Sequence, residues 1–120
     1  MSTLYSPCRF RLPLQYNDGR RVEPEILVEI FQALTRQFGG YTPLGIAESD
    51  WGPQGGTEPT MGIEVAVAPD RIDELEQVVI AIGRRLGQKL MYFDAPAPSV
   101  KFLDMGDSES AKGLKDVNRK

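Results

Sequence analysis

The sequence carries two kinds of hydrophobic period, and the order in which they occur constrains the fold more than any other feature. Four short segments are typical of strands, because apolar residues alternate with polar ones or form a short run. Two longer segments carry apolar residues three or four positions apart, which is typical of amphipathic helices. The expected strands are at 9–15, 41–47, 61–67 and 90–93, and the expected helices are at 24–38 and 71–86.

This β-α-β-β-α-β order predicts an α+β domain of the ferredoxin-like type, a two-layer sandwich with both helices on one face of an antiparallel sheet. Apolar residues resume at Val100 and Phe102 after a proline-rich break, so we also allow an extra C-terminal strand. The single domain is expected to span residues 1–104. Residues 105–120 are polar and without apolar periodicity, which predicts a disordered tail.

Residues suited to helix ends mark both expected helices. Pro24 fits the first helical position, where its missing N–H is no loss, and Gly39 fits the left-handed position after the last turn. Asp70 is expected to be the N-cap of the second helix, since its carboxylate can accept a backbone N–H there. Gly87 is expected to end that helix.

The second and third strands are expected to be joined by a long projecting loop at 48–60. Glycines and prolines interrupt this segment, and its thirteen residues exceed the roughly two to five of an ordinary hairpin loop. Before the loop, Leu44 and Ile46 are expected to share one face of the second strand. Trp51, inside the loop, either anchors a partner or folds inward onto the sheet.

Charge is unevenly distributed along the chain, whose net charge is −3. Residues 39–70 contain five acidic residues and no lysine or arginine, so the hairpin is a local negative pole that should repel nucleic acid. Arginines near the first strand, Arg9, Arg11, Arg20 and Arg21, are expected to pair with these acids. The candidate binding residues for a ligand or partner are Glu48, Asp50, Trp51, Gln54, Glu58 and Glu64.

The composition excludes several kinds of chemistry. Histidine is absent and Cys8 is the single cysteine, which excludes Ser-His and Cys-His nucleophiles, the usual zinc sites and an internal disulfide. The segment GPQGG lacks the ending of a phosphate-binding loop. We therefore expect no cofactor, no metal and no catalytic residue. The sequence also lacks a signal segment and a membrane-spanning run, which predicts a cytoplasmic protein without membrane contact.

A resemblance adds to this interpretation. The layout of a helix ending in FGGYT, then Trp51, a strand, a helix ending in RRLGQ, and a closing APAPSVKF resembles a family of small uncharacterised bacterial ferredoxin-like proteins. The likeness covers residues 9–104. That family has no established activity, so the resemblance implies a fold and not a function.

The sequence favours a non-enzymatic interaction module that presents its acidic, Trp-bearing loop to a partner protein or a small ligand. The alternative is a small carboxylate-dependent enzyme, with or without a divalent cation, in which Tyr41 or Tyr92 acts as a donor. Its candidate carboxylates are Glu48, Asp50, Glu58 and Glu64. A four-stranded sheet covered on one face also predicts a homodimer or higher homo-oligomer that buries the open sheet face.

Overall fold

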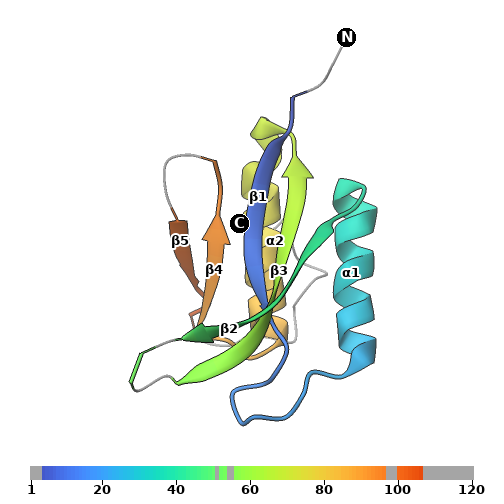
Figure 1. The fold of residues 1–120 in the computed structure, drawn as a ribbon. Helices are drawn as coiled ribbons and strands as arrows, with labels where there is room; N and C mark the ends of the chain where they lie inside the picture. Colours follow the sequence, from blue (N-terminus) through green and yellow to red (C-terminus); the bar gives the residue numbers. More distant parts are fainter. Residues whose placement is uncertain (1–3, 51, 54–55, 97–99, 107–120) are drawn as a thin grey trace.

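The computed structural model describes residues 4–50, 52–53, 56–96 and 100–106. These residues form an α+β fold in which two helices pack on a five-stranded antiparallel sheet (Figure 1). A 3-10 turn, Pro69–Arg71, precedes the second helix. The remaining elements are β1 Ser6–Pro13, α1 Pro24–Phe38, β2 Thr42–Asp50, β3 Thr57–Val67, α2 Ile72–Arg85, β4 Leu90–Asp94 and β5 Val100–Asp104.

The strands lie in the order β2-β3-β1-β4-β5. The central strand β1 pairs antiparallel with β3 on one side and with β4 on the other. β2 and β5 form the two edges, and β5 is the extra C-terminal strand that the sequence allowed. This arrangement is compatible with the expected ferredoxin-like fold.

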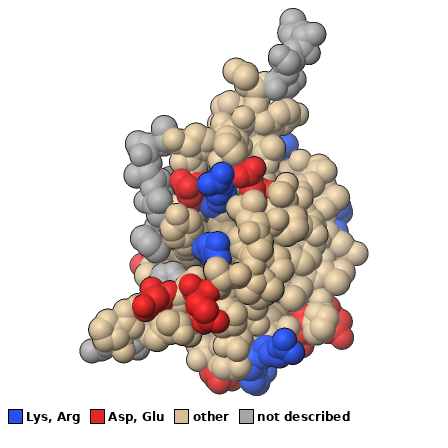
Figure 2. All heavy atoms as spheres, viewed as in Figure 1, with Lys and Arg blue, Asp and Glu red and all other residues tan. Residues whose placement is uncertain are grey.

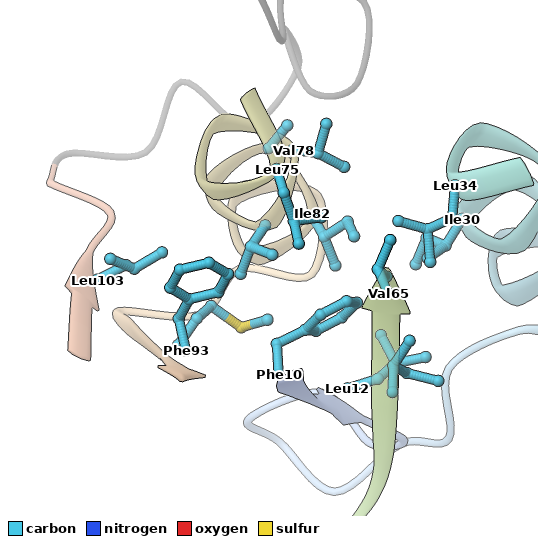
Figure 3. Close-up of a cluster of buried hydrophobic side chains, with 14 of the residues drawn as sticks. Phe10, Leu12, Ile30, Leu34, Val65, Leu75, Val78, Ile82, Phe93 and Leu103 are labelled. Carbon is cyan, nitrogen blue, oxygen red and sulfur yellow. The ribbon is translucent and has the colours of Figure 1, made fainter. Parts of the chain in front are cut away.

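The hydrophobic core lies between one face of the sheet and the two helices. Alternate residues of β1 and β3 are buried toward the helices, whose apolar stripes pack on them (Figure 3). Each fully buried large apolar side chain contributes on the order of 1.5–3 kcal/mol through the hydrophobic effect. No helix among the described elements covers the other face of the sheet. The buried side chains include Cys8, Phe10, Leu12, Ile30, Leu34, Ile63, Val65, Leu75, Ile82, Met91 and Phe93.

The predicted ends of α1 are confirmed, whereas the predicted start of α2 is wrong. Pro24 is the first residue of α1, and Gly39 caps the helix with φ 87°, donating its N–H to the Thr35 carbonyl. Asp70 lies inside the 3-10 turn instead of capping α2, and the helix begins only at Ile72. Pro69 begins this turn, and its fixed φ suits a 3-10 conformation. An N-cap residue instead needs an extended backbone, which Asp70 inside the turn does not have.

The connection between β2 and β3 is much shorter than predicted, because both strands continue into the expected loop. Glu48 pairs with Pro59, and Asp50 pairs with Thr57, so only residues 51–56 connect the strands. Pro59 is tolerated within β3, where its carbonyl accepts the N–H of Leu14 at 3.2 Å. Glycine and proline residues therefore did not interrupt the ladder where the sequence analysis expected.

The expected common face of Leu44 and Ile46 is also wrong. The β2–β3 ladder shifts its register just before Ile46, and Gly45 lies within this shift with φ 99°. Ile46 pairs with Met61, whose side chain packs against the core, so Ile46 faces the helix side. The Cβ of Leu44 instead lies 3.2 Å from the position of a Cβ built on Gly62, on the open face. A β-bulge thus turns two residues of one strand to opposite faces.

The folded part of the chain extends past residue 104. Met105, assigned to the tail by the sequence, is 1% exposed, and its N–H donates to the Lys89 carbonyl at 3.0 Å. Gly83 of α2 makes room for it, since a Cβ there would lie 2.6 Å from the sulfur of Met105. The predicted disordered tail, from residue 107 onward, lies outside the described residues. Within the described part of the chain, no helix is long and apolar enough to cross a membrane.

Candidate functional site on the open sheet face

The face of the sheet opposite the helices is charged and polar. The alternation that buries Phe10 places its neighbours Arg9 and Arg11 on this open face. Glu64 and Gly62 lie directly across from these arginines on β3. Figure 2, in the orientation of Figure 1, shows basic and acidic side chains close together over the sheet. This surface is therefore suited to polar recognition more than to burial against an apolar partner.

Arg9 forms an ion pair across two strands. Its Nε donates to Oε1 of Glu64 at 2.8 Å, and this hydrogen bond raises the pKa of Arg9. Asp94 is opposite Arg9 on the other neighbouring strand, β4, and its charge also raises that pKa. The Arg9 side chain is 54% exposed, so the pair contributes little to stability. The main consequence of the pair is that the carboxylate of Glu64 already has a cationic partner, Arg9.

Arg11 is held differently, without a carboxylate. Its Nε donates to Oγ1 of Thr60 at 3.0 Å, and its Nη2 donates to the Thr60 carbonyl at 3.4 Å. The buried Thr60 hydroxyl is itself hydrogen-bonded to that of Ser49 at 2.8 Å, which fixes its position. Gly62 leaves the space, since a Cβ there would lie only 2.8 Å from Nη1 of Arg11. The guanidinium is thus oriented over β3 by neutral partners.

A hollow of about 230 Å³ lies on this face beside Arg11. Two of its charged groups, Arg11 and Asp94, make no ion pair within the described part of the chain. The hydrogen bonds that hold Arg11 use Nε and Nη2, which leaves Nη1, beside Gly62, without an acceptor among the described residues. The hollow thus combines an arginine and a carboxylate that make no ion pair in the described structure with an aliphatic side chain and an aromatic ring. Its lining is Arg9, Phe10, Arg11, Leu44, Gly62, Tyr92 and Asp94.

The structure disperses the site residues that the sequence predicted. Glu64 borders the hollow through its pair with Arg9. Glu48, Asp50 and Glu58 lie farther along the hairpin, in β2 and β3, and Asp50 accepts the N–H of Gly52 at 2.9 Å. In the described residues no three acidic or cysteine side chains come close enough together to hold a metal ion. Two further predicted residues, Trp51 and Gln54, lie outside the described part of the chain.

Among the described residues, the expected pairing of the arginines with acids of the hairpin holds only for Arg9. Arg20 pairs with Asp18 in its own turn, Nε to Oδ2 at 2.8 Å, and it also stacks over the ring of Tyr16. Two residues of the hollow, Asp94 and Tyr92, were not expected beside the arginines. A signal existed, since both alternate with the buried residues of β4. This alternation shows which face Tyr92 and Asp94 occupy, but only the strand order shows that β4 lies beside β1.

No family model matches the sequence, and no curated protein matches it. Among solved structures, the chain is similar to a phage SAM lyase in complex with S-methyl-5′-thioadenosine, with a TM-score of 0.64 and 12% identical residues. The match covers 87% of this chain and 92% of the lyase chain. At this identity the likeness concerns the fold alone.

Proposed function

We propose that this protein is a ferredoxin-like binding module whose open sheet face takes a small zwitterionic metabolite in the hollow beside Arg11. One observation carries the proposal: a half-buried arginine is oriented by Thr60 and has no carboxylate partner among the described residues. In a chain of net charge −3, an unpaired and fixed guanidinium is the natural site for an anionic group. The negative end of the ligand is therefore assigned to Arg11.

The positive end of the ligand is assigned to Asp94. This carboxylate lies two strand positions from Tyr92 on the same face, and it makes no hydrogen bond to another described residue. Arg9, the nearest cation across the ladder, is bound to Glu64. A ligand cation can therefore approach Asp94 without displacing an existing partner. Leu44 and Tyr92 supply the apolar surface that such small sites commonly need.

The ferredoxin-like assignment is supported by the strand order and by the two helices on one face. The structural neighbour supports a ligand of nucleoside size, because that phage enzyme is described with S-methyl-5′-thioadenosine bound. The acidic hairpin retains a part in this proposal. Its base supplies Leu44 and Gly62 to the hollow, while Glu48 and Asp50 lie farther out, where a second macromolecule could contact them.

Calorimetry with a panel of amino acids, betaines and nucleoside-linked amino acids tests the proposal. Arg11→Met should weaken any hit by about 10- to 100-fold, the loss expected for charge-assisted hydrogen bonds of roughly 1.5–3 kcal/mol. Asp94→Asn should selectively weaken ligands that carry a cation. Arg20→Gln is the matched control, since Arg20 pairs locally with Asp18 away from the hollow. Equal binding by Arg11→Met and wild type would refute the assignment.

A carboxylate-dependent enzyme is the second candidate, and the lyase neighbour is the observation that favours it. The hollow offers Asp94 as a base and Tyr92 as a donor, two groups that acid–base chemistry can use. Incubation with SAM, followed by chromatography for S-methyl-5′-thioadenosine, tests this candidate directly. Product formation that Asp94→Asn abolishes would support the enzyme. Binding of SAM without turnover would instead support the binding module.

A further inference from the structure

A second surface of the molecule lies on the flank formed by α1 and β2. It is apolar, whereas the open sheet face is charged. A groove of about 650 Å³ follows the outer side of α1. The rings of Phe31 and Tyr41 stack at its centre with their centroids 4.8 Å apart, and Val28 beside them is 51% exposed. The lining residues are Val28, Phe31, Gln32, Thr35, Arg36 and Tyr41.

The edge strand β2 begins directly after Tyr41, the last residue of the groove in the sequence. Ile46 is 65% exposed although it faces the same side of the sheet as the helices. β2 pairs with β3 on one side only, so its outer edge is open in the described structure. Pro43 lacks an N–H and Gly45 breaks the register, which limits a continuous ladder with a further strand. A partner on this flank must therefore be recognised mainly through side chains.

Charges of opposite sign lie at the two ends of the flank. Arg36, in the last turn of α1, stands beside the start of β2, and Glu48 lies near the other end of that strand. Neither side chain makes an ion pair within the described part of the chain. No lysine or arginine occurs in residues 39–70 that could neutralise Glu48 locally. The flank thus has an apolar centre, a free cation at one end and a free anion at the other.

We infer that this flank is the interface between two copies of the chain, related by a twofold axis near Ile46. A twofold axis perpendicular to β2 sets the two β2 strands antiparallel, which brings Arg36 of each copy toward Glu48 of the second copy. The same patch is then complementary to itself in both polarity and charge. This places self-association on the α1–β2 flank and leaves the open sheet face free. The inference does not depend on the proposed ligand.

Charge reversal tests the inference, with light scattering during gel filtration as the readout. Wild type should elute with twice the chain mass of 13.3 kDa at micromolar concentration. Arg36→Glu alone and Glu48→Arg alone should each give the monomer mass, because each opposes like charges twice across the axis. The double variant Arg36→Glu, Glu48→Arg should recover the dimer. Ile46→Asp should also give the monomer mass, and neither charge reversal should restore the dimer in that variant.

Three controls keep these outcomes interpretable. Circular dichroism of each variant checks that it folds, and Arg20→Glu, an exposed arginine paired to Asp18, should leave the dimer intact. A monomeric wild type, a double variant that stays monomeric, or a mass of three or more copies would overturn the twofold interface. A dimer that Arg9→Glu dissociates while Arg36→Glu does not would locate self-association on the open sheet face instead.

Discussion

Replacing Glu74 with glutamine should destabilise the fold by weakening a hydrogen-bonded ion pair that links the end of α1 to the start of α2. Arg71 donates two hydrogen bonds to this carboxylate, from Nε and from Nη2, each at 2.8 Å. The side-chain amide of Gln37 donates a third at 2.8 Å. Arg71 also donates to the Gln37 carbonyl at 2.8 Å and lies over the ring of Phe38 at 5.0 Å. Glutamine keeps the shape of the side chain but not its charge.

The pKa of Glu74 gives the magnitude. The hydrogen bonds from Arg71, and then from Gln37, lower it from 4.5 to about 2. One pKa unit corresponds to about 1.36 kcal/mol, so this difference sets an upper limit of about 3.4 kcal/mol on what the ionised Glu74 contributes to stability. Because the Glu74 side chain is 27% exposed and that of Arg71 41%, water screens the pair. We expect a loss of about 1–2 kcal/mol in the free energy of unfolding at pH 7.

The pH dependence carries the sharper test. A carboxyl whose pKa is lower in the folded state stabilises the protein above its unfolded pKa, and this contribution is lost as pH falls toward about 2. Urea denaturation at pH 7, 5 and 3 should therefore show the gap between wild type and Glu74→Gln shrinking with acidity. Glu29→Gln is the control, because Glu29 is 44% exposed and makes a single 3.3 Å contact with Arg85, so its loss should matter little. A gap that is absent at pH 7, or unchanged at pH 3, would refute the reasoning.

Three further predictions concern single positions. Gly83→Ala should cost about 1–3 kcal/mol in urea denaturation by overpacking, since the new Cβ would lie 2.6 Å from the sulfur of Met105. Gly62→Ala should weaken ligand binding in calorimetry more than it lowers stability, because the new Cβ would lie 2.8 Å from Nη1 of Arg11 and push the guanidinium out of position. Burial, and then the charge of Asp94, raises the pKa of the Cys8 thiol, so a thiol reagent should label it slowly in the native protein and rapidly in urea.

The order and type of the helices and strands could be predicted because the signals are local. Pro24 and Gly39 act on their own backbone, so a reader of the sequence can place the ends of α1 from these residues alone. The burial of Met105 could not be predicted in this way. It depends on Gly83, twenty-two positions earlier, leaving space on α2. A contact of that kind becomes visible only when the two elements are already packed together.

The candidate site shows the same division between local and distant information. The alternation around Arg9 and Arg11 places both arginines on the polar face of β1, and the pairing of Arg9 with the acidic hairpin followed from the distribution of charge. The hollow itself depends on β4 lying next to β1, which brings Tyr92 and Asp94 to the arginines. Periodicity predicts the face of a residue, whereas strand order decides its neighbours.

The bulge in β2 connects the two proposed surfaces. In a regular strand Leu44 and Ile46 would point to one face, but the register shift turns Leu44 into the hollow and Ile46 onto the α1–β2 flank. Gly45, at φ 99°, adopts a conformation that other residues rarely take, so the arrangement depends on glycine there. One strand can therefore serve a polar site and an apolar interface without either surface interrupting the other.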